Sequence, residues 1–575
     1  SPANNFEIKF IDSTGNNVWW VNNRNYLFPG EWKKIRIKKR HIEFAWGPAG
    51  GQALTRIDRI EFTVASFVGG KGTLWIDDLR FEPLGPELNT WPVPVASASS
   101  SARRHRPELI FDGDDLTYWQ SRKTGNQEVT VDFGIKREFG GLQIKWLKGR
   151  QAGSFDIFLS DDGITWEKSY SVPANRGDVS FVRLPEAEAR YLRLALSDPA
   201  ADEGFGISSI EIPGIRSTMT PNDFILYCAK NSPVGNYPGY FSEQASYWTI
   251  TGVNNDTREA LINEDGMVEV DKSLFSVEPM VRIGDTLFNW SNTKPVQSLG
   301  FPGSGGEFDF IPSVTWSHGG LKFTTGVSSG GTANVNSVLN IGYALANQSG
   351  RSLDLELFLL VRPFQVNPYY QFLNTTGGTG KINSLEEEAP GLIAVDDKVI
   401  MISRKYDAFG ASVSDEGNIV DMIRKGKMPP GRSATDLSGM ANGVIRYDIH
   451  LQPGEQTELF AAVPYHGRKS YTGNQGNTEI SDGFYTEADF DDSEIPEDFY
   501  RAADFWRAKT DHIRFRLPAS ADRIIETWKS NLVYILINRD NVGIQPGSRS
   551  YKRSWIRDGA LTSSALIKSG IVPEV

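Results

Sequence analysis

The chain has 575 residues, of which 39% are hydrophobic, 23% charged and 11% aromatic. This is the composition of a globular protein, and at roughly 100–200 residues per domain the length predicts several domains. The formal net charge of −11 argues against a nucleic-acid partner, because such binding depends on Lys and Arg side chains that neutralise phosphates.

Residues 1–84 contain short runs that are rich in β-forming residues or alternate between polar and apolar residues, and this pattern predicts strands. The runs are NFEIKFID, KKIRIKK, RIDRIEFTVA and GTLWIDDLRFEPL. The last run resembles the closing strands of carbohydrate-binding jelly rolls. Such modules usually begin well before their equivalent of NFEIKFID, so we expect a partial jelly roll whose first strands precede Ser1.

Two adjacent tryptophans, Trp19 and Trp20, lie in the run NNVWWVNN. Neighbouring side chains of a strand point to opposite faces of the sheet. We therefore expect one indole ring in the core and the other exposed, where it could stack on a sugar. Packing of both rings into the protein is the alternative.

Residues 85–102 are rich in Pro, Ala and Ser, show no sustained period and predict a linker. Residues 103–213 contain further strand-like runs, namely VTVDFG, GLQIKWL, SFDIFLSDDGITWEKSY, FVRLP, ARYLRLAL and ISSIEIPG. Together with the preceding DGD and Thr-x-Trp patterns, these runs resemble the discoidin module, the coagulation-factor C-type jelly roll found beside many bacterial glycosidases. Trp119 and Trp166 match the framework pattern of that family, so we expect both in the core and assign no sugar site to this segment.

The run FDGDDLTYW places Asp112, Asp114 and Thr117 in a tight turn that contains a glycine. Carboxylate, hydroxyl and carbonyl oxygens are the ligands that Ca²⁺ prefers. In discoidin modules this loop binds a structural calcium ion that a Glu of the closing strand completes, and Glu211 matches that Glu by position. The resemblance therefore implies a calcium site, whereas the residues alone are also consistent with an Asx-turn without metal.

Residues 214–513 are β-rich and dense in turns, without helical periodicity, and predict a large two-sheet sandwich. The only cysteine, Cys228, excludes an intrachain disulfide, and its apolar run FILYC predicts a small buried hydrophobe. Two acidic clusters, Glu386 to Glu388 and Asp489 to Asp498, offer carboxylates. A glycosidase needs two carboxyl groups at defined separations, so we interpret both clusters as solvated loops or ion sites.

The pattern changes near Pro518, and residues 514–575 predict two helices. In SADRIIETWKSNLVYILINRD the apolar residues recur at helical spacing, and Ser520 is the expected N-cap. After a loop, DGALTSSALIKSG predicts a second helix that ends at Gly570. A helix pair this apolar needs partners to cover it, so we interpret it as the start of an α-domain.

The second predicted helix opens with the sequence SWIRDG, which contains Trp555, Arg557 and Asp558. The Arg side chain offers a rigid fork of donors and the Asp side chain offers acceptors, so the pair could hold neighbouring hydroxyls of a sugar ring. The indole of Trp555 offers a flat apolar face for the C–H side of that ring. An Arg–Asp pair at a helix N-terminus is also a common structural feature, and the dipole favours the carboxylate there.

The order of these segments, with a large β-sandwich before a helical hairpin that opens with W-x-R-D, resembles the glucoamylase-like, six-hairpin glycosidases. The segments ALINEDGMVEV, FSVEPMVRI and IPSVTW are similar to the supersandwich of that clan. The resemblance implies a mainly β fold, with a jelly-roll module, a discoidin jelly roll, a supersandwich and the first helices of an (α/α)6 barrel. It also implies that Trp555, Arg557 and Asp558 bind substrate at the barrel mouth.

The implied function is that of a secreted, periplasmic or cell-surface glycoside hydrolase that acts on a poly- or oligosaccharide. In this clan an acid protonates the leaving oxygen while a base activates water, usually with inversion. Both groups lie on later hairpins, so the catalytic residues are expected beyond Val575. No organic cofactor is expected, and no apolar run reaches the about 18 residues of a membrane span.

Three alternatives remain open. A glycoside phosphorylase on the same scaffold would use phosphate in place of the attacking water, although the binding modules at the N-terminus count against it, because such phosphorylases act mostly on small intracellular sugars. A non-catalytic carbohydrate-binding or adhesion protein could also be built from these β-modules. A polysaccharide lyase combines a helical toroid with a supersandwich, but there the toroid usually comes first.

Overall fold

The structure is a computed structural model, and the fold is mainly β, as predicted. It describes residues 4–26, 28–65, 72–83, 91–272, 274–305, 308–371, 376–466, 494–540, 543–549 and 551–575. The chain divides into two compact units, Ser1–Thr90 and Trp91–Val575, which are described separately.

The first unit contains a four-stranded antiparallel sheet. Its strands are β1 (Asn4–Ile11), β2 (Val18–Tyr26), β3 (Glu43–Trp46) and β4 (Arg59–Ala65), in the order β3-β2-β1-β4. Trp19 lies in the core of this unit with Phe6, Ile8 and Phe10. Trp20 is partly exposed, and its ring meets the ring of Trp46 edge to face at 5.5 Å. The two adjacent tryptophans therefore differ in burial, as strand alternation predicts.

Two of the strands predicted in the first unit are absent from its described residues. Residues 33–38 have no regular structure and lead into a short 3-10 helix, Lys39–His41. Residues 72–83 also form no strand, and the side chains of Trp75 and Phe81 are 74% and 71% exposed. Both runs have strand-like composition, but a strand also needs a neighbour to accept its backbone hydrogen bonds. Neither run has such a neighbour among the residues that the structure describes.

The second unit begins with a seven-stranded antiparallel sheet, in which β5 pairs with β7 and the remaining order is β6-β11-β7-β10-β8-β9. Its strands are β5 (Val95–Ala98), β6 (Trp119–Gln120), β7 (Gln127–Trp146), β8 (Ala152–Ser160), β9 (Glu167–Val172), β10 (Val179–Pro199) and β11 (Gly206–Glu211). Strand β5 lies inside the predicted linker 85–102, so the folded segment starts earlier than composition suggests.

Two tryptophans that were predicted as core residues of this sheet have different surroundings. Trp119 is fully buried, as predicted. Trp166 is only partly buried, and the guanidinium carbon of Arg193 lies 3.8 Å from the centre of its ring. The prediction is wrong for Trp166, because a cation–π contact on the outer surface occupies this indole instead of core packing.

The central part of the second unit is a sandwich of two antiparallel sheets that share one hydrophobic core. The first sheet comprises β12 (Trp248–Gly252), β13 (Glu259–Asn263), β14 (Val268–Glu269), β15 (Ser276–Ile283), β16 (Thr286–Phe288), β21 (Leu353–Arg362), β25 (Ala408–Val413) and β27 (Ala441–Leu451). The second comprises β17 (Val296–Leu299), β18 (Pro312–His318), β19 (Leu321–Gly330), β20 (Val338–Asn347), β22 (Ser384–Ala389), β23 (Leu392–Val395), β24 (Lys398–Ile402), β26 (Ser433–Thr435) and β28 (Gln456–Pro464).

Helices interrupt the region that was predicted to lack helical periodicity. They are α1 (Pro221–Lys230), α2 (Ile419–Arg424) and α3 (Ile495–Thr510). Helix α1 has a capping box between Thr220 and Asp223, which is a sequence signal of a helix start. It also buries Cys228, which is 1% exposed as predicted, and burial raises the pKa of its thiol. Helix α3 packs on the second sheet, where it buries Phe499, and its Trp506 lies in a separate hydrophobic cluster that includes Phe308 and Phe310.

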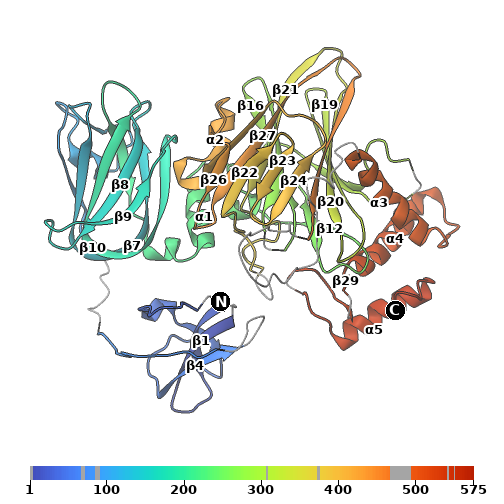
Figure 1. The fold of residues 1–575 in the computed structure, drawn as a ribbon, viewed down its shortest axis with the longest axis horizontal. Helices are drawn as coiled ribbons and strands as arrows, with labels where there is room; N and C mark the ends of the chain where they lie inside the picture. Colours follow the sequence, from blue (N-terminus) through green and yellow to red (C-terminus); the bar gives the residue numbers. More distant parts are fainter. Residues whose placement is uncertain are drawn as a thin grey trace, which may run out of the picture. The chain divides into compact units, whose positions relative to one another are not determined.

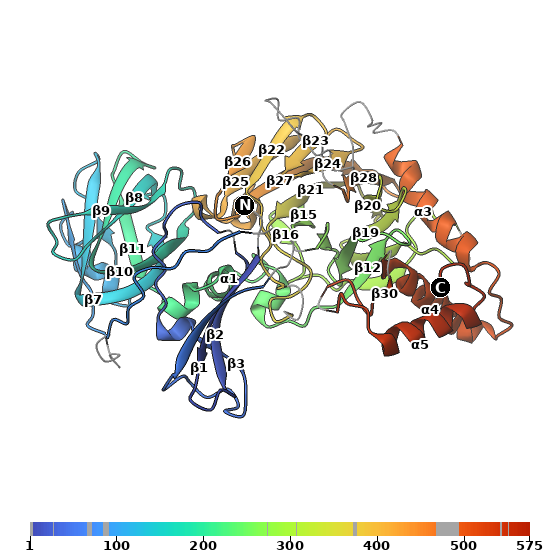
Figure 2. The same cartoon turned by 60° about the horizontal axis from the view of Figure 1, so that its bottom comes forward.

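The two predicted C-terminal helices are confirmed as α4 (Asp522–Ile537) and α5 (Ile556–Lys568). Between them lies a short hairpin of β29 (Arg539–Asp540) and β30 (Gly543–Ile544). Gly570 follows α5 with a positive φ of 80°, which suits a helix stop. Ser520 is not the N-cap, because it lies in a 3-10 turn, Ala519–Ala521, and α4 begins after Ala521 without a side-chain cap. Figures 1 and 2 show α3, α4 and α5 at one end of the sandwich.

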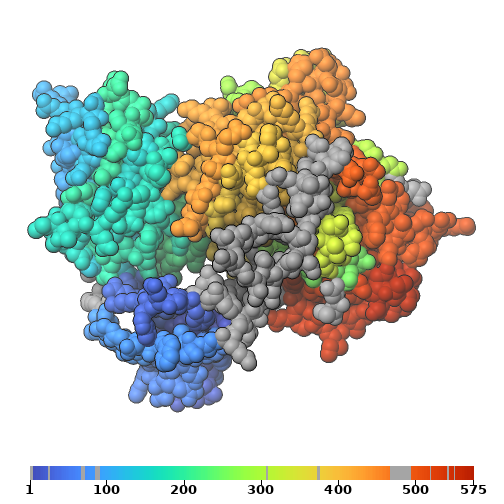
Figure 3. All heavy atoms as spheres, in the orientation of Figure 1, coloured from blue at the N-terminus to red at the C-terminus, as the bar shows by residue number. Residues whose placement is uncertain are grey.

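The discoidin-like sheet is docked on the sandwich at the end away from these helices. The hydroxyl of Tyr170 donates to Asp415 at 2.8 Å, and the ammonium of Lys425 lies 2.7 Å from Asp178. The amide of Arg176 donates to a carbonyl in the loop after β25. Figure 3 shows the cyan and green atoms of the sheet against the orange residues of the sandwich. Side chains and main chain together therefore hold the two parts of this unit in contact.

Candidate functional site

The start of α5 carries the three residues that were predicted to bind a sugar. Trp555 is the N-cap residue of α5, in an extended conformation and without a side-chain cap. Its partly exposed ring meets the ring of Tyr551 edge to face at 5.6 Å. Arg557 and Asp558 follow in the first turn of the helix. The structure therefore brings the three predicted residues together on one helix start.

The charged pair of this site is open to solvent. The side chain of Arg557 is 83% exposed and that of Asp558 is 28% exposed, and Nη2 of Arg557 lies 3.4 Å from Oδ2 of Asp558. An exposed ion pair of this length contributes little to stability. Its donors and acceptors remain accessible to a ligand that, like a sugar diol, offers both.

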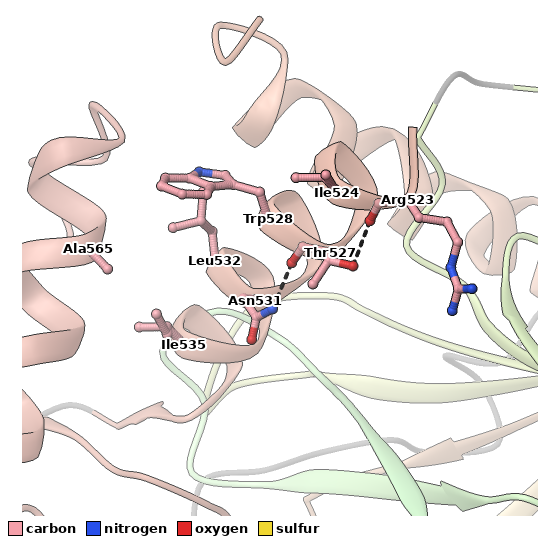
Figure 4. A pocket seen from close by; sticks show the side chains of 8 residues that line it. All are labelled: Arg523, Ile524, Thr527, Trp528, Asn531, Leu532, Ile535 and Ala565. Carbon is pink, nitrogen blue, oxygen red and sulfur yellow. Dashed lines mark hydrogen bonds between the residues drawn. The ribbon is translucent and has the colours of Figure 1, made fainter. Parts of the chain in front are cut away.

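A hollow on the helical end lies elsewhere, between α4 and α5 (Figure 4). It measures about 500 Å³, and its lining comprises Arg523, Ile524, Thr527, Trp528, Asn531, Leu532, Ile535 and Ala565. Trp528 and Ile524 are 46% and 62% exposed. A sugar site needs a few convergent polar groups, whereas the atoms exposed in this hollow are mostly apolar, although Arg523, Thr527 and Asn531 belong to its lining.

The turn that was predicted to bind calcium is closed by its own hydrogen bonds. One carboxylate oxygen of Asp112 accepts from the Thr117 hydroxyl at 2.7 Å, and the other accepts from the Asp114 amide at 2.9 Å. The Thr117 hydroxyl also lies 3.0 Å from the Asp114 carbonyl. The hydrogen bond from Thr117 is the main cause of a lowered pKa of Asp112. The turn thus gathers carboxylate, hydroxyl and carbonyl oxygens, which are the donor types that fit Ca²⁺.

Glu211, the fourth predicted ligand, has a different contact. It ends β11, and its carboxylate accepts a hydrogen bond from the hydroxyl of Tyr227 on α1 at 3.1 Å. Burial is the main cause of the raised pKa of Tyr227. Across the part of the chain that the structure describes, no group of three or more His, Cys, Asp and Glu side chains could hold a metal ion. The residues Asp112, Asp114 and Thr117 are brought together, and Glu211 contacts α1 instead.

The first acidic cluster lies in a strand, and the described part of the second lies at a helix start. Glu386 to Glu388 lie in strand β22 rather than in a loop, and Glu387 accepts a hydrogen bond from Tyr406 and pairs with Arg432. Part of the second cluster, residues 489–493, lies outside the described residues. The remainder enters α3, where Asp498 pairs with Arg501.

Another residue of the α4–α5 loop is notable because it is charged and buried. Arg549 is only 3% exposed and lies 2.8 Å from the buried carboxylate of Glu269. Neither residue was singled out from the sequence. A loop arginine carries no sequence signal of burial, since the two partners are 280 residues apart.

The comparison with known proteins identifies one segment of the chain. Residues 95–211 match the family model of the F5/8 type C domain. This segment therefore forms an F5/8 type C domain, the family to which the predicted discoidin resemblance belongs. The match begins at β5, inside the predicted linker. No curated protein sequence matches the chain.

Several solved structures are similar to this domain. Chitosan-binding module 1 from a chitosanase/glucanase of Paenibacillus sp. IK-5 is 23% identical, with coverage of 21% of this chain and 96% of that chain and a TM-score of 0.20. Chitosan-binding module 2 of the same enzyme, in complex with chitotriose, is 20% identical over 21% and 97%, with a TM-score of 0.21. A family 32 carbohydrate-binding module from C. perfringens NanJ, in complex with galactose, is 16% identical over 21% and 92%, with a TM-score of 0.20.

Proposed function

We propose that the chain belongs to a secreted, periplasmic or cell-surface glycoside hydrolase. The observation that carries the proposal is the start of α5, where the N-cap residue Trp555 is followed in the first helical turn by the accessible Arg557–Asp558 pair. In this proposal the three residues form one wall of a sugar subsite, in which the indole stacks on the ring and the charged pair binds its hydroxyls. The F5/8 type C domain supports a carbohydrate partner, because similar modules have been solved with chitotriose and galactose.

The proposed partner is a poly- or oligosaccharide, and neither nucleic acid nor a membrane is part of the proposal. Within the described residues, no helix is both long and apolar enough to span a bilayer. We propose that Ca²⁺ binds the turn of Asp112, Asp114 and Thr117 in a structural role. The bound Ca²⁺ would take the place of the Thr117 hydroxyl proton that Asp112 now accepts. Glu211 would become a ligand once its hydrogen bond from Tyr227 is broken. We assign no general acid or base.

The test is a panel of polysaccharides and oligosaccharides offered to the full-length protein, with binding measured by calorimetry and bond cleavage by release of reducing ends. The proposal expects binding that Asp558→Ala or Arg557→Ala weakens, together with cleavage that does not require phosphate. Cleavage only in the presence of phosphate would assign a phosphorylase instead. Binding without any cleavage would leave a non-catalytic carbohydrate-binding protein, and absence of binding to every glycan would refute the subsite.

A further inference from the structure

The loop between α4 and α5 is attached to the sandwich through Arg549. Its Nε donates to Oε1 of Glu269 at 2.8 Å, and its Nη2 donates to the main-chain carbonyl of Glu259 at 3.0 Å. Its Nη1 lies 4.0 Å from the Glu259 carboxylate and donates to the hydroxyl of Ser548 at 3.1 Å. All three nitrogens of the guanidinium are thus engaged, two of them by groups on strands β13 and β14.

The partner carboxylate of Glu269 is held on its other side by the main chain. Glu269 is fully buried, and its Oε2 accepts the amide hydrogens of Val366 and Asn367 at 2.8 and 3.0 Å. One oxygen therefore faces two amides while the other faces Arg549. The direction of the guanidinium is therefore fixed, since this rigid planar group bonds Glu269 through Nε and the Glu259 carbonyl through Nη2 at the same time.

A second cation of the loop binds close to the same strand. The ammonium of Lys552 lies 3.4 Å from the carbonyl of Thr257, which also accepts from Lys272 at 2.6 Å. Lys272 in turn pairs with Glu259 at 2.6 Å. Burial raises the pKa of Glu259 and lowers that of Lys272 to about 8. Burial thus acts against both charges of the pair, and their mutual attraction, with Arg549 nearby, opposes it.

The anchored residues lead directly into the proposed subsite. The amide of Lys552 donates to the carbonyl of Arg549 at 3.1 Å, which closes a tight turn. Three residues later Trp555 accepts the amide hydrogen of Gly559 at 2.8 Å and opens α5. Only this short turn separates the buried guanidinium from Trp555, so a change in the direction of Arg549 would also move the start of α5.

A buried ion pair contributes little net free energy to the stability of a fold. Removal of two charges from water costs several kcal/mol per ion, and apolar residues of similar volume are often as stabilising. What a buried ion pair adds is a single geometry. We infer that Arg549 is a positioning residue that fixes Trp555, Arg557 and Asp558 relative to strands β13 and β14 of the sandwich. This inference rests on the proposed function, because it assigns to Arg549 the orientation of that same subsite.

The test compares Arg549→Lys, Glu269→Gln and the control Lys568→Met by amide hydrogen exchange and by glycan binding. Lys568 lies in the last turn of α5 and its side chain is exposed. Arg549→Lys keeps a charge but loses the fork of donors, so the chain is expected to fold. The expected result is exchange about tenfold faster in residues 551–559 with unchanged exchange in α1, together with about tenfold weaker glycan binding. Glu269→Gln is expected to act in the same direction, and Lys568→Met is expected to change neither quantity.

Three outcomes would overturn the inference: exchange in residues 551–559 that stays at the wild-type rate, exchange that rises equally in α1, or glycan affinity that is unchanged despite faster local exchange. The failure of the proposed function has a different signature. In that case the wild-type protein binds no glycan, whereas the variants still change exchange in residues 551–559.

Discussion

The contact between the F5/8 type C domain and the sandwich predicts a stability that changes with pH. Burial raises the pKa of Asp415 to about 6, the charge of Asp436 adds to this rise, and the hydrogen bond from Tyr170 opposes it. The ordinary value is 3.8. Between these two values the folded protein binds more protons than the unfolded chain, so the free energy of unfolding decreases as pH rises through this window.

The magnitude follows from the size of the shift. A difference of about two pKa units corresponds to about 3 kcal/mol at 1.36 kcal/mol per unit. Asp415 retains partial exposure, so we expect about half of this value because solvent screens its charge. The variant Asp415→Asn keeps an oxygen that can accept from Tyr170 but carries no charge. It should therefore be more stable than the wild type by about 1–2 kcal/mol at pH 7.5.

The assay is urea unfolding of the wild type and of Asp415→Asn at pH 4, 5, 6 and 7.5. The advantage of the variant should be largest at pH 7.5 and should shrink toward zero as Asp415 is protonated near pH 4. Tyr170→Phe is the companion variant. It removes the hydroxyl that donates to Asp415 and should therefore raise the pKa of that carboxyl group further. Parallel stability curves for wild type and Asp415→Asn across this range would refute the reasoning, as would an advantage that grows toward low pH.

Three further predictions concern the two ends of the second unit. Asp558→Ala should weaken glycan binding or turnover at least tenfold while the melting temperature stays nearly unchanged, because an exposed ion pair contributes little stability; a lower melting temperature with intact binding would assign Asp558 to helix stabilisation instead. Removal of calcium by EDTA should lower the melting temperature of the wild type, and Asp112→Ala should abolish this effect; a wild type indifferent to EDTA would exclude the calcium proposal. Phe499→Ala should lower the free energy of unfolding by about 3–5 kcal/mol in urea titrations, because its fully buried ring contacts Phe301 and Phe460, and a loss below about 1 kcal/mol would contradict that packing.

Local periodicity was sufficient for the parts of the fold that depend on near neighbours. The spacing of apolar residues predicted α4 and α5, and strand alternation predicted that Trp19 and Trp20 would differ in burial. The residue pattern of the F5/8 type C domain was equally informative, because its strands carry their own hydrophobic face. Helix α3 was missed although its buried residues recur at helical spacing, since the acidic run before it resembles a loop.

Pairing between distant segments could not be read from these patterns. Residues 33–38 and 72–83 have the composition of strands, yet a ladder requires a neighbouring strand that local sequence does not reveal. Trp166 matches a framework position of its family, but its environment is set by Arg193 on another strand. Exposure and pairing are properties of the assembled sheet.

The candidate site shows the same division. Trp555, Arg557 and Asp558 are close in sequence, and a helix start brings them together whatever the rest of the chain does, so the sequence by itself was enough to select them. Only the tertiary structure reveals Arg549, because its burial depends on Glu269, 280 residues earlier in the chain. The local sequence determined which side chains could contact a sugar. Long-range packing determined that Arg549 is the residue that positions them.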